Sequence, residues 1–221
     1  MKPTPLKVDF VSDVSCPWCA IGLWSLEQAR SRIGDELAVD LHFQPFELNP
    51  QMPPGGQGIE EHLMEKYGAT PEQSAHTREA IRARGEAVGF EFRMDRRSRI
   101  YNTFDAHRLL HWAEVEGRQQ ALKQALFRAY FTDGESPESH EVLLRLAQEV
   151  GLDAARAQQI LASDEFAAEV REREQFYSRQ GIHSVPAVIV NDRHLISGGQ
   201  PPEVFEQALR QIAAQRIDTA A

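Results

Sequence analysis

Cysteine is scarce in this chain, with only two among 221 residues. A structural zinc site needs about four ligands, and no second cysteine pair is available to complete one. Among the histidines, His107 and His111 stand four residues apart, as two ligands on one helix face would. None of the histidines has ligand-like spacing beside the cysteine pair, so we predict no metal site.

Positive charge is also in short supply, because 24 lysines and arginines face 33 aspartates and glutamates, for a formal net charge of -9. Non-specific binding to nucleic acids needs clustered cations, so we expect no nucleic-acid partner. The one basic cluster comprises Arg93, Arg96, Arg97 and Arg99. We interpret it as a solvated loop, with an anion site as the alternative.

The sequence has no stretch that approaches the roughly 18 apolar residues of a membrane-spanning helix, so we expect no membrane partner. The first residues also lack the apolar core of a secretory signal, because Lys7 and Asp9 interrupt it. These observations predict a cytoplasmic protein. In that compartment a permanent structural disulfide is not expected.

Alternating apolar residues predict strands near both ends of the chain. Residues 6–10 and 37–43 alternate, and a helical pattern between them ends at Gly34. This β-α-β unit should pack as parallel strands with a right-handed crossover. Near the other end, residues 187–190 and 194–196 are predicted to form a hairpin.

The middle of the chain is predicted to be helical, after a loop rich in proline and glycine at residues 49–58. Thr70, Pro71 and Gln73 predict a capped helix start, and that helix should run to Val88. Further helical patterns fill the segment, and another closes the chain. A sheet core split by a helical insertion explains why the predicted strands cluster at the two ends.

The two cysteines stand together as Cys16-Pro17-Trp18-Cys19, shortly after the first predicted strand. Residues three apart at a helix start lie about 5–6 Å from each other, within reach of a disulfide. Free backbone N–H groups and the helix dipole favour an anion at the first position, so Cys16 is the expected thiolate nucleophile. Cys19, one turn further in, is placed to resolve a mixed disulfide. Two inert core cysteines remain the alternative.

Four segments of the chain resemble the DsbA family of thiol–disulfide oxidoreductases, and most closely its FrnE-like cytoplasmic branch. They are the active-site segment Ser12–Gly22, the helical signature Asn102–Leu109, and the late segments Gly181–Pro186 and Ser197–Pro202. The resemblance covers nearly the whole chain, in order.

The resemblance implies an α/β protein with a thioredoxin-like fold and an all-helical insertion domain. Residues 1–48 and 164–221 would form the thioredoxin-like domain, and residues 49–163 the insertion. It also implies a redox-active disulfide between Cys16 and Cys19 and no tightly bound cofactor. The expected partners are thiol- or disulfide-containing proteins or small thiols, with glutathione as a candidate co-substrate, and a homodimer is compatible with this family.

In this fold a cis proline precedes the third strand and faces the cysteine pair. We therefore expect the Val185–Pro186 bond to be cis, with Val185 and Pro186 contacting substrate. Pro17 and Trp18 project outward from the predicted helix start. We expect both to contact substrate, with Trp18 exposed.

Other residues have two interpretations each. Asn102 and His107 either line a substrate groove across the domain gap or serve as an N-cap region and an ordinary helix histidine. His183 either tunes the nucleophilic thiolate or lies in a turn without contact. Asp13 is a candidate proton relay. Gly198-Gly199 either binds an anion or forms a plain turn.

Two other functions stay open. Kappa-class glutathione transferases and 2-hydroxychromene-2-carboxylate isomerases resemble this chain in layout, but they typically have serine in place of Cys16 and lack the paired cysteine. The presence of both Cys16 and Cys19 therefore favours a protein thiol–disulfide oxidoreductase. A non-catalytic peptide-binding chaperone that uses the helical insertion is the second alternative.

Overall fold

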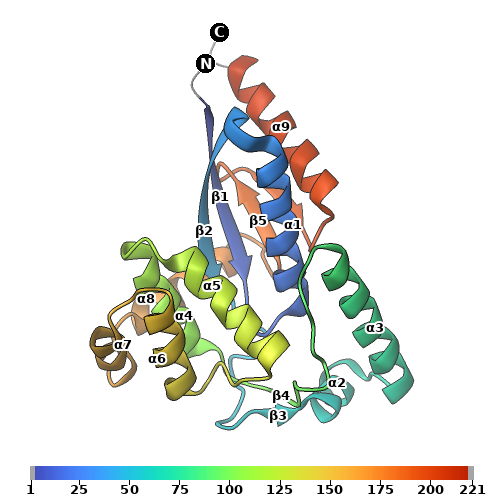
Figure 1. Cartoon of the computed structure of the whole chain (residues 1–221), viewed down its shortest axis with the longest axis vertical. Coiled ribbons are helices and arrows are strands. Elements are labelled where there is room, and N and C mark those ends of the chain that lie inside the picture. Colours follow the sequence, from blue (N-terminus) through green and yellow to red (C-terminus); the bar gives the residue numbers. More distant parts are fainter. Residues whose placement is uncertain (1–2, 219–221) are drawn as a thin grey trace.

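A four-stranded sheet with helices on both faces organises the computed structural model, which describes residues 3–218 (Figure 1). Residues 1–2 and 219–221, at the two ends of the predicted thioredoxin-like domain, lie outside the described residues. The strands are β1 (Thr4–Ser12), β2 (Leu37–Pro45), β3 (Gln57–Gly58), β4 (Arg99–Ile100), β5 (Ala187–Val190) and β6 (His194–Ser197). The helices are α1 (Pro17–Ile33), α2 (Ile59–Tyr67), α3 (Pro71–Ala87), α4 (Phe104–Val115), α5 (Gln119–Arg128), α6 (His140–Glu149), α7 (Ala154–Leu161), α8 (Ala167–Arg179) and α9 (Pro202–Asp218).

The main sheet has the strand order β2-β1-β5-β6. β1 pairs in parallel with β2, whereas the β1–β5 and β5–β6 pairs are antiparallel. Residues 4–45 therefore form the predicted β-α-β unit, and the late strands form the predicted hairpin. The predicted α/β class is confirmed, with the sheet strands drawn from both ends of the sequence.

The alternation in β1 decides which helices cover each face of the sheet. Leu6, Val8 and Phe10 are fully buried in one cluster with residues of α1 and α9. These two helices lie side by side in Figure 1. Val11 points to the opposite face, where it packs with Tyr177 of α8. With both faces covered, β1 is the central strand of the core.

The helices α4, α5, α6 and α7 enclose a second apolar cluster, with Leu109, Leu126 and Leu143 among its buried residues. Val14, just after β1, belongs to this second cluster rather than to the core around the sheet. The turn that leads to the cysteines therefore lies where the two clusters meet. The domain division at residues 48 and 163 stays a prediction.

The start of α3 follows its sequence signal, whereas one small sheet had no signal in the sequence. The Thr70 hydroxyl accepts from the Gln73 N–H, and the Gln73 side chain accepts from the Thr70 N–H, which completes the predicted capping box of α3. β3 and β4 form a two-stranded antiparallel sheet inside the segment predicted to be all helical. Each strand has only two residues, too few to show an alternation in the sequence.

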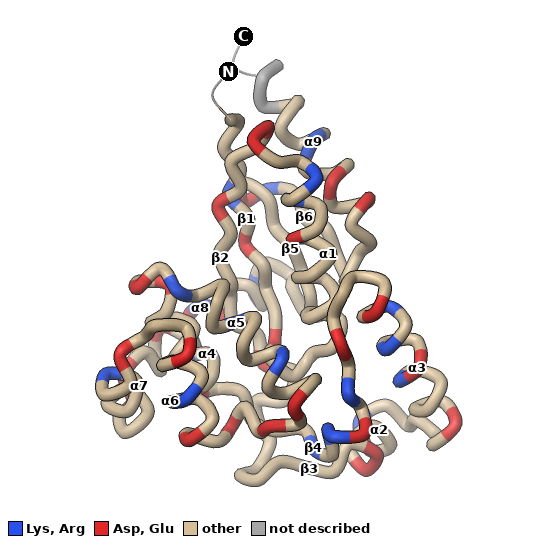
Figure 2. Tube along the Cα trace, in the orientation of Figure 1, with Lys and Arg blue, Asp and Glu red and all other residues tan. Residues whose placement is uncertain are grey.

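Charged side chains of both signs are interspersed along most elements (Figure 2). Within residues 3–218, no helix combines the length and apolar character needed to cross a membrane.

The turn after β6 packs against the first turn of α1. Gly198 has a φ of 82°, and its N–H donates to the Pro186 carbonyl oxygen at 2.8 Å. A Cβ atom on Gly199 would lie 2.7 Å from the Trp18 carbonyl oxygen. The glycine pair therefore serves a close backbone approach, and the plain turn is the interpretation that fits this packing.

We predict that Gly199→Ala lowers the free energy of unfolding by about 1–3 kcal/mol, because the new methyl group would collide with backbone that cannot rotate away. Urea unfolding of the reduced protein measures the change. Gly58→Ala is the matched control, since its Cβ would meet only the Glu61 side chain at an ordinary 3.7 Å. Equal stability of Gly199→Ala and the native chain would show that the turn is not closely packed.

Candidate active site

Cys16 occupies the N-cap position of α1, where the chain passes from an extended conformation into the helix. Its backbone has φ -92° and ψ 114°, and Pro17 follows as the first helical residue. The Cys16 carbonyl accepts from the N–H groups of Cys19 and Ala20 at 3.1 and 3.3 Å. No acidic residue lies in the first turn, so the positive end of the helix dipole faces the Cys16 sulfur without a competing carboxylate on the helix.

The two sulfur-bearing residues differ in access. Cys19 is fully buried, whereas Cys16 is 4% exposed and lines a large cavity. The Cys16 thiol donates to the Val185 carbonyl oxygen at 3.7 Å. The loop at Val185 and the cavity walls therefore cover nearly all of Cys16. The cavity is the side from which Cys16 is accessible, whereas Cys19 is enclosed.

Burial, and then the hydrogen bond with the Cys16 side chain, raise the pKa of the Cys19 thiol well above its usual value. A thiol with a raised pKa stays protonated at neutral pH unless a neighbouring positive charge stabilises its thiolate. Lys123 of α5 supplies such a charge, and it opposes the effect of burial on Cys19.

Lys123 is only 1% exposed, and such complete burial is rare for a lysine. Burial lowers the pKa of Lys123 to about 8. Charge interactions with Cys19, Asp13 and Cys16 act in the opposite direction and limit the decrease. Its ammonium nitrogen lies 5.1 Å from the centre of the Phe127 ring. At neutral pH the side chain is therefore largely protonated, and its charge acts on Cys19 from inside the protein.

The Asp13 carboxylate ties together the turn that carries Cys16. It accepts from the Ser15 N–H at 3.1 Å, the Ser15 hydroxyl at 2.9 Å, the Leu48 N–H at 2.7 Å and the Thr103 hydroxyl at 2.8 Å. Burial alone would raise the pKa of Asp13, but the pairing with His107 and the backbone donors outweigh it and bring the value to about 2. Asp13 is therefore an anion that fixes the local structure.

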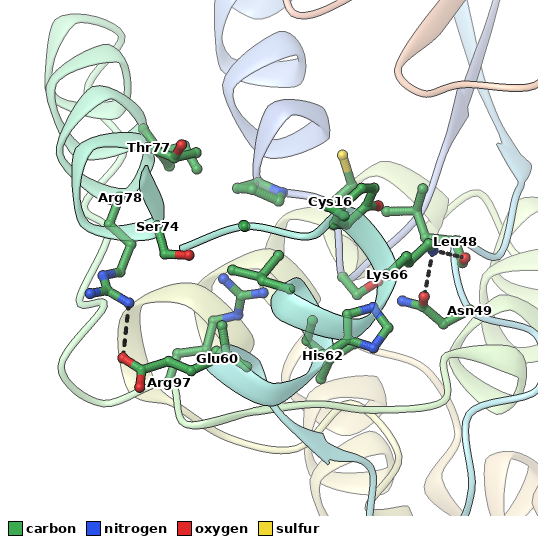
Figure 3. A pocket seen from close by; sticks show the side chains of 18 of the residues that line it. Cys16, Leu48, Asn49, Glu60, His62, Lys66, Ser74, Thr77, Arg78 and Arg97 are labelled. Atoms are coloured by element: carbon green, nitrogen blue, oxygen red, sulfur yellow. Dashed lines mark hydrogen bonds and ion pairs between the residues drawn. The ribbon is translucent and has the colours of Figure 1, made fainter. Parts of the chain in front are cut away.

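The cavity beside Cys16 has a volume of about 1290 Å³ (Figure 3). Residues of α2 and α3 form one side, and the segments at residues 46–49 and 94–100 form the others. Of the predicted substrate contacts, Pro17, Trp18 and Val185 line it. Trp18 is half-buried rather than exposed as expected, because its side chain packs against the apolar core around the sheet.

Pro186 is buried behind Val185, and the Val185–Pro186 peptide bond is cis. His183 lies at the cavity wall and is exposed. Three predicted substrate contacts, Pro186, Asn102 and His107, do not line the cavity. Asn102 accepts from the Phe104 N–H at 2.9 Å, as a residue at a helix start does, and His107 is buried 3.6 Å from Asp13.

Direct substrate contact by Asn102 and His107 is therefore not supported, because Asn102 accepts a hydrogen bond within the protein and His107 is buried. Among the described residues, no group of three His, Cys, Asp or Glu side chains is arranged to hold a metal ion.

Lys123 was missed in the sequence, although its position carried a signal. It lies four residues from both Gln119 and Phe127, which are buried on the same helix face. A lysine on the apolar face of a helix is the pattern that would have drawn attention to it.

A model of the DSBA-like thioredoxin domain matches residues 7–210. This chain belongs to the DSBA-like thioredoxin family. The probable DsbA oxidoreductase of Streptomyces coelicolor has a similar structure, with a TM-score of 0.87 and 35% identity over 93% of this chain and 89% of that chain. The family assignment confirms the thioredoxin-like fold and supports an oxidoreductase.

Two further solved structures share the DsbA-like fold. A 2-hydroxychromene-2-carboxylate isomerase has a TM-score of 0.75 at 14% identity, covering 97% of this chain and 100% of that chain. The cytosolic disulfide reductase DsbM from Pseudomonas aeruginosa, solved with GSH, has a TM-score of 0.62 at 20% identity, covering 93% and 98%. At these identities the likeness concerns the fold alone.

We predict that Lys123→Met stabilises the reduced protein by about 1–3 kcal/mol below pH 8, because it removes a buried ammonium. In the native chain the pKa falls from 10.5 to about 8 on folding. Between these values the unfolded chain holds more protons, so native stability rises with pH there. The difference between the variant and the native chain should therefore shrink from pH 8 towards pH 10.5.

Urea unfolding at pH 7 and pH 10 measures this difference. Arg128→Met, at an exposed position of the same helix, controls for the loss of one positive charge. A Lys123→Met protein that is less stable than the native chain at pH 7, or a difference that does not change with pH, would contradict the prediction.

Proposed function

We propose that this protein is a thiol–disulfide oxidoreductase that exchanges disulfides through Cys16 and Cys19. The observation that carries the proposal is the unequal placement of the two thiols: Cys16 caps α1 and lines the cavity, and Cys19 lies buried behind it. Attack from outside is then directed at Cys16, and Cys19 reacts only with the sulfur bound to Cys16.

In the oxidising direction, a substrate thiolate attacks the Cys16 sulfur of the Cys16–Cys19 disulfide. The enzyme disulfide breaks, a mixed disulfide forms on Cys16, and Cys19 leaves as a thiolate that takes up a proton. A second substrate thiolate attacks the substrate sulfur and releases the Cys16 thiolate. Two electrons pass from the substrate to the enzyme, and the reverse sequence reduces a substrate disulfide.

Lys123 and Asp13 serve these steps in different ways. The Lys123 ammonium offsets the negative charge on Cys19 when that thiolate leaves, and in the reverse direction it favours the Cys19 thiolate that attacks. Asp13 stays ionised and holds the turn in place through its bonds to Ser15 and Leu48. Both are positioning residues, because neither touches the substrate.

The substrates that fit this chemistry are thiol- or disulfide-containing proteins or small thiols. Glutathione remains a candidate co-substrate, and the FrnE-like branch and a cytoplasmic location remain predictions from the sequence. The oligomeric state, including the homodimer considered above, is equally untested. Net direction follows from the reduction potential of the pair relative to its surroundings rather than from the motif.

The two alternatives make different demands on the site. A glutathione-dependent isomerase or transferase would use one activated group at the helix start and would not need Cys19. A peptide-binding chaperone would need neither thiol. The close burial of a second thiol behind the first, with a lysine beside it, favours exchange over both alternatives.

We predict that Cys16→Ser abolishes the reduction of insulin by dithiothreitol above the uncatalysed rate, because the attacking sulfur is lost. Cys19→Ala should react once and then accumulate a mixed disulfide on Cys16, which mass spectrometry detects. Ser31→Ala, at an exposed position of the same helix, should behave as the native chain.

Undiminished insulin reduction by Cys16→Ser would remove the proposal. If the Cys19→Ala variant still forms glutathione conjugates, or still catalyses a glutathione-dependent isomerisation, the transferase or isomerase alternative would be favoured. Peptide binding that does not respond to either substitution, without any exchange activity, would favour the chaperone.

A further inference from the structure

The arginines at residues 93–99 do not behave as one solvated cluster. Arg93 pairs with Asp95 at 3.4 Å, and Arg96 is exposed. Arg99 donates to the backbone carbonyls of Gly55 and Gly56, both at 2.7 Å. Arg97 differs from these three, because it is half-buried and lines the cavity that opens at Cys16 (Figure 3).

The Arg97 guanidinium lies against aromatic rings instead of a carboxylate. Its central carbon is 4.8 Å from the centre of the Tyr130 ring and 5.0 Å from that of Phe131, and the Tyr130 hydroxyl is a polar neighbour. The buried Nε atom has no hydrogen-bond partner. Within residues 3–218, no ion pair joins Arg97 to an acidic side chain. A guanidinium carries five N–H donors, so those not turned to the Tyr130 hydroxyl remain to bind an anion.

The other cations of the cavity wall already have partners (Figure 3). Arg78 contacts Glu60 at 3.4 Å. Lys66 donates to the Leu48 carbonyl and to the Asn49 side chain, both at 2.7 Å.

Most acids of the wall have partners as well. Asp95 pairs with Arg93, and Glu47 with Arg171 of α8. Glu61 is exposed to solvent at the start of α2. The positive charge of Arg97 is thus left for whatever enters the cavity.

We propose that Arg97 binds a carboxylate of the substrate, so that the thiols and disulfides that react at Cys16 are preferentially those that carry a carboxylate. The inference rests on the proposed function, since it names the chemistry of that substrate. The carboxylate itself does not react. When Cys16 thiolate attacks an anionic disulfide, the substrate S–S bond breaks, a Cys16–substrate disulfide forms, and the released thiolate takes a proton from water.

The carboxylate can come from a small acidic thiol or from an acidic residue beside a cysteine in a peptide. A charged hydrogen bond of this kind contributes about 1.5–3 kcal/mol, which corresponds to about a tenfold or larger change in rate. The test therefore compares variants of Arg97 on matched substrates of both kinds.

The experiment uses the Cys19→Ser chain, which traps the mixed disulfide on Cys16. Bis(2-carboxyethyl) disulfide is the anionic probe, bis(2-hydroxyethyl) disulfide the neutral probe and cystamine the cationic probe. Mass spectrometry of quenched samples gives each rate. We expect Arg97→Gln to slow the anionic probe by about tenfold or more and to leave the neutral probe within about twofold.

Two further variants separate recognition from general effects. Arg96→Gln removes the same charge from an exposed neighbour and should change every rate by less than about twofold. Arg97→Lys keeps the charge and should recover part of the anionic rate. The unchanged neutral rate in Arg97→Gln shows that the variant is folded.

The inference is overturned if Arg97→Gln slows the neutral and anionic probes equally, or if Arg96→Gln matches it. A second arm uses disulfide-linked peptides with Glu or Gln beside cysteine. If Arg97 affects the rate with the peptides but not with the small disulfides, the carboxylate belongs to a peptide. If Arg97 affects the rate with neither kind of substrate, the inference is overturned. If no probe reacts with the native Cys16, the proposed function fails as well.

Discussion

The Asp13 carboxylate holds the active-site turn between the sheet and the helices that follow it. Its oxygens accept hydrogen bonds from Ser15 in the turn, from Leu48 after β2 and from Thr103 before α4. Three segments far apart in the sequence therefore meet at one buried anion. Because Cys16 follows three residues after Asp13 and its N–H donates to the Asp13 carbonyl oxygen at 3.3 Å, these bonds help to place the Cys16 backbone.

The same arrangement creates the difference between the two thiols. Cys16 faces a cavity, and Cys19, one helical turn further on, is enclosed. Burial therefore raises the pKa of the Cys19 thiol. Lys123 reaches this interior from α5, outside the β-α-β unit that carries the cysteines. The helical part of the chain therefore provides one wall of the substrate cavity and also a charge behind the redox pair.

The sequence was enough to predict the sheet, the capping box at Thr70 and the Cys16–Cys19 pair, because each depends on a local pattern. The pair β3–β4 could not be predicted, since two-residue strands carry no periodicity. The burial of Cys16 and Trp18 depends on residues such as Val185 that arrive from the other end of the chain.

Arg97 shows the same limit for charge. Its sequence neighbours made a solvated loop the default, and only the packing of Tyr130 and Phe131 against it distinguishes it from Arg96. For Asn102 and His107 the structure fits the second interpretation, a residue near a helix start and an ordinary helix histidine. Their proximity to the active-site turn was expected, but hydrogen bonds within the protein occupy Asn102, and His107 is enclosed beside Asp13.

The central claim is that Cys16 and Cys19 form one two-electron redox pair. A direct test equilibrates the protein in a series of glutathione redox buffers. The free thiols are then alkylated, and the mass of the protein is measured by mass spectrometry. The account predicts that both thiols disappear together in one transition and that the oxidised protein carries an internal disulfide. Two thiols that stay free across the series, or Cys16 held only as a glutathione adduct with Cys19 still reduced, would contradict it.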